Sequence, residues 1–65
     1  MLRIRAERLK RHWSQTDLGG RARVATSDVS RIENGRLIPY ERQISRLARA
    51  LKLRPDQLLE PVEGE

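Results

Sequence analysis

Residues 14–35 read SQTDLGGRARVATSDVSRIENG, a pattern that predicts two short helices joined by a tight turn. Ser14 and Asp17 have the spacing of a capping box, in which each side chain bonds the backbone amide of the other residue. Val29 and Ile32 are three residues apart, so they share one face of the later of these two helices. The opposite face carries serines, an aspartate and an arginine, which a helix does not need for packing alone.

Two glycines and a tight connection decide how the two helices meet. Gly19 suits a place where two helices approach closely, because glycine has no β-carbon to intrude. Gly20 has no such role, although each glycine costs a helix about 1 kcal/mol relative to alanine. Residues 23–25 form the connection between the two helices. Gly35 can take the left-handed conformation that ends the later helix near residue 33 or 34. The candidates for the cap of that helix are Ala25, Thr26 and Ser27.

The flanking segments add three more predicted helices. Residues 2–12 contain strong helix formers and no glycine or proline. Residues 41–51 show the clearest amphipathic pattern, with apolar residues at i, i+3, i+4 and i+7. Pro39 closes the loop before them, and Pro55 suits the first position of a last short helix over 55–59. The apolar side chains expected in the core from these segments are Leu2, Ile4, Leu9, Trp13, Ile44, Leu47, Ala48, Leu51, Leu58 and Leu59.

Five short helices and no strand make the predicted fold all-α. The 65 residues predict one small domain over 1–60, followed by an acidic tail over 61–65. A chain of this size buries a limited core, so its stability has to come from well-packed helices, from a second subunit, or from both.

The composition argues against several classes of function. There is no cysteine, and His12 is the single histidine, so neither a thiolate nor a histidine metal site is expected, and no cofactor. No catalytic motif is present, so we do not expect an enzyme. No signal peptide or membrane span is indicated, and the lack of cysteine fits a reducing cytoplasm.

The charge of the chain is unevenly distributed. The net charge is +5. Residues 1–36 contain nine lysines or arginines against four acids, whereas residues 37–65 contain five of each. The excess in the first half favours a polyanionic partner such as nucleic acid. The alternative is a solvated basic surface that serves solubility.

The segments WSQTDLGGRARVATSDVSRIENGRLIP and ISRLARALKLRPDQLL resemble the lambda-repressor-like helix-turn-helix family, also called the XRE family. The similarity runs from about Ile4 to Leu59. Its most specific parts are SQ at the start of the second helix, SRIENG at the end of the third, Pro39 in the loop, and LAxxL in the fourth. The resemblance implies that the second and third helices form the helix-turn-helix, and that the third enters the major groove of double-stranded DNA.

The start of the third helix and the residue one turn later point at base edges in this arrangement. Arg31 is the sharpest candidate, because a guanidinium can grip guanine O6 and N7 together. The alternative role of Arg31 is an ion pair with Asp28. The alternative role of Thr26, Ser27 and Asp28 is capping of the helix. The predicted base-reading residues are Thr26, Ser27, Asp28, Ser30 and Arg31.

A second set of residues is predicted to contact DNA phosphates. Gln15 lies at a helix N-terminus, where the side-chain amide, the backbone N–H groups and the helix dipole can meet one phosphate. Asn34 matches a family position that contacts the backbone after the third helix. Ordinary solvated surface is the alternative for these side chains. The predicted phosphate contacts are Ser14, Gln15, Arg23, Asn34, Arg36 and Tyr40.

The chain departs from the family pattern at three positions, and the resemblance also implies one ion pair. Arg23 and Lys52 stand where the family usually has glycine, and a non-glycine residue with positive φ costs about 1 kcal/mol. Ala25 replaces a usual Ser or Thr cap, which shifts the helix start toward residue 26. The glutamate matching Glu33 pairs in the family with an arginine that aligns with Arg8, so we predict a buried structural salt bridge between these two residues.

The sequence therefore predicts a sequence-specific transcriptional regulator, a repressor that binds a palindromic operator as a homodimer. The predicted dimer surface is the last helix with Leu53, Leu58 and Leu59, for which simple core is the alternative. A second hypothesis is a protein-interaction adaptor or antitoxin that uses the same fold to hold a protein partner.

Overall fold

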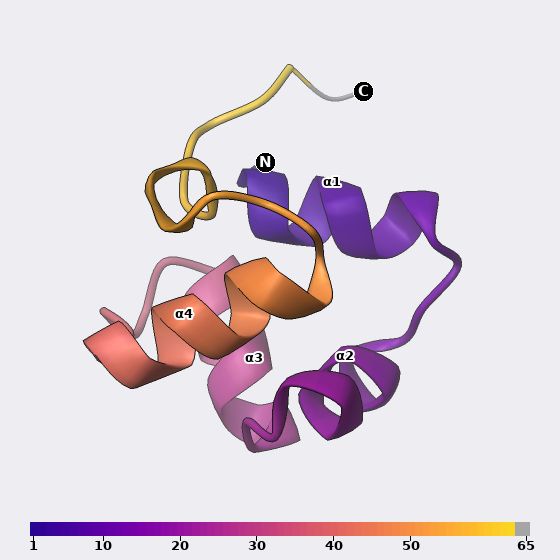
Figure 1. Ribbon diagram of the computed structural model, residues 1–65. Coiled ribbons are helices and arrows are strands. Elements are labelled where there is room, and N and C mark those ends of the chain that lie inside the picture. The colour runs from indigo at the N-terminus through magenta and orange to yellow at the C-terminus, as the bar shows by residue number, and fades with distance from the viewer. Residues whose placement is uncertain (64–65) are drawn as a thin grey trace.

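The computed structural model describes residues 1–63 and forms one bundle of short helices (Figure 1). The described part of the chain contains no β-strand, only an isolated bridge between Leu2 and Pro61. The predicted all-α class is confirmed, but the predicted fifth helix over 55–59 is a single 3₁₀ turn. The elements are α1 (Arg3–Lys10), α2 (Gln15–Ala22), α3 (Thr26–Glu33), α4 (Glu41–Ala50) and the 3₁₀ turn η1 (Pro55–Gln57).

Helix α1 is shorter than predicted and presents a different face to the core. Ile4 is fully buried and Arg8, four residues later, is also buried. The prediction that Leu9 packs in the core is wrong, because Leu9 is 44% exposed. One residue beyond Arg8 corresponds to about 100° around the helix, which turns Leu9 toward solvent. The helix ends before His12, whose φ of 59° lies in the left-handed region.

The predicted capping box at the start of α2 is confirmed. The Asp17 backbone N–H donates to Ser14 Oγ at 2.9 Å, and the Ser14 N–H donates to Asp17 Oδ2 at 2.8 Å. The close approach expected at Gly19 is present, but its nearest partner is the turn after α2, since a β-carbon there would lie 2.6 Å from the carbonyl oxygen of Val24 and 3.3 Å from Thr26 Oγ1 at the start of α3. A β-carbon at Gly20 would meet nothing within 4 Å, and nothing in the structure explains this glycine.

The connections between helices rely on left-handed residues. Arg23 and Lys52 both have a φ of 58°, so each adopts the conformation of the glycine that it replaces in the family pattern. Gly35, with a φ of 73°, follows α3 as predicted. Ala25 is the N-cap residue of α3 and has no side-chain capping bond. Thr26 and Ser27 lie inside the first turn of α3, so neither of them is its N-cap residue.

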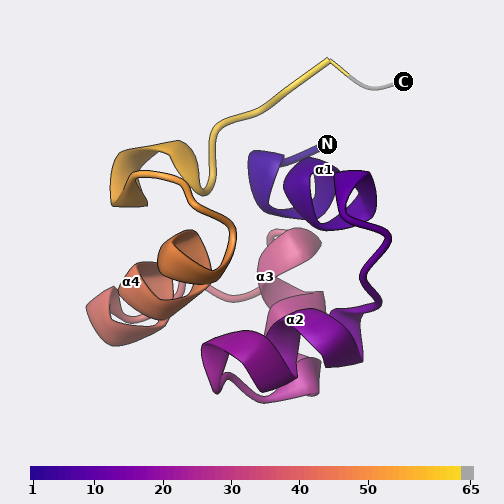
Figure 2. The same ribbon diagram turned by 45° about the vertical axis from the view of Figure 1, so that its right-hand side comes forward.

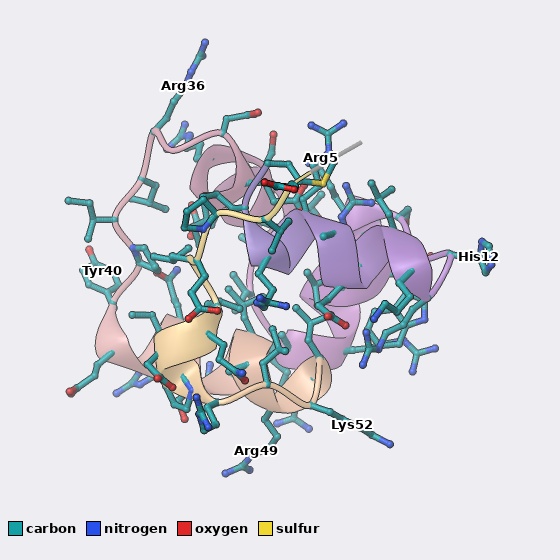
Figure 3. All side chains as sticks on the ribbon, turned by 90° about the horizontal axis from the view of Figure 1, so that it is seen from above. Arg5, His12, Arg36, Tyr40, Arg49 and Lys52 are labelled. Carbon is teal, nitrogen blue, oxygen red and sulfur yellow. The ribbon has the colours of Figure 1, made fainter. Side chains whose placement is uncertain are left out.

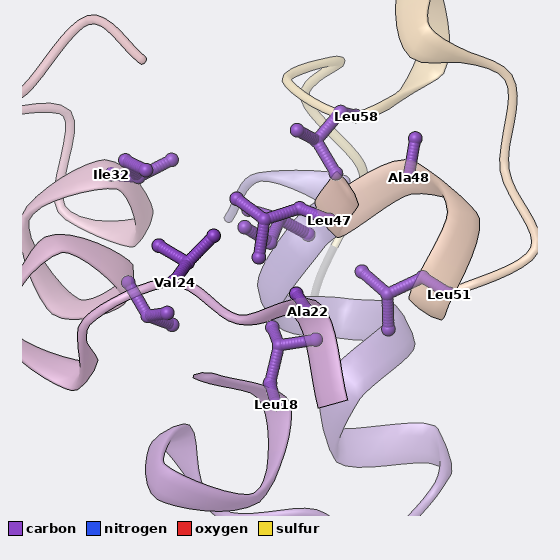
Figure 4. Close-up of a cluster of buried hydrophobic side chains, with 10 residues drawn as sticks. Leu18, Ala22, Val24, Ile32, Leu47, Ala48, Leu51 and Leu58 are labelled. Carbon is purple, nitrogen blue, oxygen red and sulfur yellow. The ribbon is translucent and has the colours of Figure 1, made fainter. Parts of the chain in front are cut away.

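The core forms between all four helices, the turn after α2 and the C-terminal turn (Figure 4). Burying a Leu, Ile or Val side chain contributes about 1.5–3 kcal/mol, so this cluster is the main stabilising element of a small domain. Trp13 is half-buried at its edge, with the guanidinium of Arg21 lying 4.3 Å from the ring centroid. The buried hydrophobic residues are Ile4, Leu18, Ala22, Val24, Val29, Ile32, Leu47, Ala48, Leu51 and Leu58.

The N-terminus and the segment that follows η1 lie on the same side of the molecule, at the top of Figures 1 and 2. The Ile4 N–H donates to the Leu58 carbonyl at 3.0 Å, and the Val62 N–H donates to the Met1 carbonyl at 2.8 Å. The beginning of the segment predicted as a loose acidic tail is thus paired with the N-terminus. Positions 64 and 65 of that segment lie outside the described residues.

Candidate nucleic-acid interface

Helix α3 has one buried face and one exposed face. Val29 and Ile32 are 0% and 1% exposed and point into the core. Ser27, Arg31 and Asn34 are all exposed, and their spacing of i, i+4 and i+7 places them on one side of the helix. The structure therefore presents a continuous polar stripe whose reverse side is held by the core.

The five predicted base-reading residues are not equally accessible. Thr26, Ser27 and Arg31 are exposed, whereas Asp28 and Ser30 are half-buried. Within residues 1–63 Arg31 forms no ion pair, so its alternative role as a partner of Asp28 is wrong. The guanidinium of Arg31 keeps its donors available for a ligand.

Asp28 is held instead by Gln43, a residue that the sequence analysis missed. Gln43 Nε2 donates to Asp28 Oδ2 at 3.1 Å, and Gln43 Oε1 accepts from the Tyr40 backbone N–H at 3.0 Å. One amide side chain thus links the start of α4 to the first turn of α3. The signal for the local half of this contact was present, because a glutamine three residues after a helix N-cap is a capping-box position.

A buried ion pair ties the end of α3 to α1. Arg8 Nε donates to Glu33 Oε2 at 2.7 Å, and the second bond, from Nη2 to Oε1, is 3.0 Å long. The two side chains are 9% and 2% exposed, so the predicted pair is present, bidentate and nearly dry. Arg8 Nη1 also donates to the Trp13 carbonyl at 2.8 Å. This geometry satisfies both buried charges and fixes the position of α3 on the domain.

Gln15 takes part in the same cluster. Its Nε2 donates to Glu33 Oε1 at 3.2 Å, which orients the side chain at the start of α2. A glutamine amide has two N–H donors and a carbonyl oxygen, so one donor and the acceptor remain for another partner. The buried Glu33 therefore links Gln15 to the end of α3, where Asn34 follows directly.

A family model described as a helix-turn-helix domain matches residues 2–61, which is nearly the whole chain. The chain belongs to the helix-turn-helix family. It is of the XRE or lambda-repressor-like type, and this membership makes it a DNA-binding domain. Comparisons with curated proteins and with solved structures give no match. Within residues 1–63 no helix is long and apolar enough to cross a membrane.

The helix-turn-helix unit consists of α2 and α3, and the predicted phosphate contacts surround it. Ser14 at the start of α2 is exposed, and its hydroxyl oxygen accepts the Asp17 N–H. A hydrogen bond from the Ser14 backbone N–H to the Asp17 carboxylate, and a second from the Ser14 side chain, lower the pKa of Asp17, so a negative charge persists at this end of α2. Arg23 and Asn34 are exposed at the ends of α2 and α3.

The loop between α3 and α4 carries the two remaining predicted phosphate contacts of the helix-turn-helix domain. Figure 3 shows Arg36 and Tyr40 projecting from this loop, away from the body of the protein. Tyr40 is 74% exposed, and Ile38 between them is 89% exposed. The loop thus offers long side chains beside the exposed face of α3.

The predicted dimer surface needs one correction. Leu58 is 0% exposed within a single chain, so it belongs to the core and its assignment to a subunit interface is wrong. The physical reason is that η1 folds back against α1 and α4 and buries this leucine locally. Leu53 is half-buried and Leu59 is 36% exposed, so these two side chains remain accessible on that side of the helix-turn-helix domain. The expectation that Leu59 packs in the core is therefore wrong, because its neighbour Leu58 takes the buried position.

Proposed function

We propose that this helix-turn-helix protein is a sequence-specific transcriptional regulator of double-stranded DNA that inserts α3 into the major groove. The observation that carries the proposal is the exposed stripe of Ser27, Arg31 and Asn34 along α3, whose opposite face is packed into the core. A guanidinium without an ion-pair partner suits a guanine, since a bidentate contact with O6 and N7 discriminates by about 1–3 kcal/mol.

Phosphate contacts position such a helix over the bases. Gln15 and Ser14 lie at the N-terminus of α2, where backbone N–H groups also face outward. Asn34, Arg36, Tyr40 and Arg23 supply further donors around α3. In the proposed complex these side chains hold the sugar–phosphate strands, and Thr26, Ser27 and Arg31 read bases, with Ser30 and Asp28 at the margin of the contact.

The regulator acts as a homodimer on a palindromic operator in this proposal. One eight-residue helix reads few bases, and two copies related by a twofold axis double the length of the site. Leu53 and Leu59 belong to the proposed subunit interface, together with the surface around η1. A small domain bound across a promoter can block transcription by occlusion alone, so we propose that the protein is a repressor. We further propose that it acts in the cytoplasm, since a chain without cysteine fits a reducing compartment.

Selection of binding sites from random duplexes tests the proposal. We expect a palindromic site whose half-sites lie about 34 Å, or one helical turn, apart. The matched variant is Arg31→Ala, which should keep the thermal stability and lose preference at one base pair, by about 1–3 kcal/mol. Failure of the wild-type protein to enrich any duplex contradicts the function. An enriched site without symmetry contradicts the dimer only.

A further inference from the structure

A groove lined by arginines lies between α4 and the end of α2. Arg42, Arg46 and Arg49 follow one another at i, i+4 and i+7, so they form one row along α4. Two cavities of about 860 and 480 Å³ adjoin this row, and both are lined by Arg23, Arg42, Ser45 and Arg46. Arg21 and Arg49 line the second cavity only. We call this continuous feature the arginine groove, and its arginines are Arg21, Arg23, Arg42, Arg46 and Arg49.

In the part of the chain that the structure describes, no carboxylate neutralises the arginine groove, and the contacts of its guanidinium groups are to uncharged partners, the Trp13 ring for Arg21 and the Arg23 carbonyl, 3.5 Å away, for Arg46. Within residues 1–63 none of its five arginines forms an ion pair, and the single acid in its lining is Glu41. The contrast with α1 is clear, since Glu7 alone pairs there with Arg3, Lys10 and Arg11. Clustered like charges repel one another in the free protein, so an anion bound in the groove would relieve this repulsion.

The groove begins at the proposed DNA-reading surface. Arg23, Val24 and Ala25 line its first cavity, and Ala25 directly precedes Thr26 at the start of α3. Tyr40, at the start of α4, lines the same cavity. A duplex read by α3 therefore brings a sugar–phosphate strand to this end of the groove. Figure 3 shows that Arg49 projects from the side of the molecule opposite to Arg36, so the groove leads away from the loop that carries Arg36.

We propose that the arginine groove is a second phosphate-binding site, which takes the DNA backbone flanking the bases read by α3. This inference rests on the proposed function. The row from Arg42 to Arg49 is about 10 Å long at 1.5 Å per residue, and one strand of B-DNA carries about three phosphates over that length. Planar guanidinium groups bind phosphate oxygens through paired N–H donors.

The test variant is R46Q/R49Q, in the groove. Its matched control is R5Q/K10Q on α1, and neither Arg5 nor Lys10 lines either cavity. Both pairs remove two positive charges from exposed side chains, and Glu7, which pairs with Lys10, keeps Arg3 and Arg11 as partners in the control. Equal thermal melting of the two variants and the wild type establishes that the fold is intact. The probe is a duplex enriched by the wild-type protein, used once with its flanking base pairs and once trimmed to the read site.

The measurement is the slope of log binding constant against log salt concentration. We expect R46Q/R49Q to reduce the magnitude of the slope by about 1.8 on the long duplex, because each lost phosphate contact removes about 0.9. The reduction should be absent for R5Q/K10Q and should vanish on the trimmed duplex, where wild type and R46Q/R49Q converge.

Four outcomes overturn the inference. Equal slopes for R46Q/R49Q and R5Q/K10Q remove the groove from the DNA contact while leaving the proposed function intact. A reduction that persists on the trimmed duplex shows that the arginines do not contact the flanks. Binding of an oligoglutamate peptide that R46Q/R49Q abolishes, with the DNA slope unchanged, assigns the groove to an acidic polypeptide. A wild-type protein that enriches no duplex removes the proposed function and this inference together.

Discussion

The two ends of α3 are held to the domain by different forces. At the C-terminal end a bidentate ion pair between Glu33 and Arg8 is almost excluded from solvent. At the N-terminal end the attachment is one hydrogen bond from Gln43 to Asp28 and the close approach of Gly19 to the turn. The strong anchor is therefore at the end away from Thr26 and Ser27, and the proposed reading end is held by packing and by one half-buried amide.

The largest effect is expected from Arg8→Ala, which breaks the strong anchor. The carboxylate of Glu33 would stay buried without its partner, which costs about 3–5 kcal/mol. A domain of this size shifts its melting temperature by about 4–8 °C per kcal/mol, so the variant should melt far below the wild type or fail to fold.

Arg11→Ala is the matched control for that experiment, because Arg11 is another arginine that bonds an acid from the same segment of the chain. Its pair with Glu7 is more exposed than the Arg8–Glu33 pair, and such pairs contribute about 0–1 kcal/mol. Arg11 Nη2 also donates to the Leu51 carbonyl at 2.8 Å, and a typical hydrogen bond adds about 0.5–1.5 kcal/mol, so the loss should stay below that of Arg8→Ala. Melting curves of Arg8→Ala and Arg11→Ala that coincide would contradict the buried anchor.

Gly19→Ala should disturb the turn that precedes the N-terminal end of α3. A β-carbon 2.6 Å from the Val24 carbonyl oxygen forces the backbone of the turn to move, and overpacking of this kind costs about 1–3 kcal/mol. Gly20→Ala is the control in the same helix, with nothing within 4 Å of its new β-carbon. It should stabilise the protein by about 1 kcal/mol through helix propensity. Chemical denaturation measures the free energy of unfolding of both variants. Changes of the same sign in the two variants would contradict the close approach at Gly19.

Gln43→Ala sharpens the comparison between the two ends. It removes the bond to Asp28 and the bond to the Tyr40 N–H, and a typical hydrogen bond contributes about 0.5–1.5 kcal/mol. We expect a modest loss of stability and faster amide exchange in the first turn of α3, with protection at Ile32 and Glu33 unchanged. Uniform loss of protection along α3 would show that the two ends do not behave separately.

The smallest effect is expected at acidic pH. A hydrogen bond from the Arg11 guanidinium lowers the pKa of Glu7 below its usual 4.5 in the folded protein. A depressed folded pKa means that the stabilisation is complete above pH 4.5 and is lost as the pH falls through the folded value.

Glu7→Gln should therefore flatten the decline of melting temperature below pH 4.5. Glu41→Gln is the control, because Glu41 has no ion pair in the described part of the chain. An acid decline of unchanged steepness in Glu7→Gln would contradict the role of this cluster.

The sequence by itself determined the contacts between near neighbours. Ser14 and Asp17 form their capping box across three residues, and Gly35 ends α3. The apolar spacing along α4 correctly indicated Leu47 and Leu51 as core residues. These features follow from covalent geometry and helix periodicity, which are the same wherever the segment lies.

The tertiary structure decided what depends on distant segments. Gln43 reaches Asp28 across 15 residues and Gln15 reaches Glu33 across 18, and no local pattern carries such pairings. The sequence offered Leu58 both as a core residue and as part of a dimer surface, and the docked 3₁₀ turn decided for the core. The arginine groove arises in the same way, since its two sides belong to α4 and to the end of α2. A sequence pattern states which face of a helix is polar, whereas the partner of that face depends on how the helices are packed.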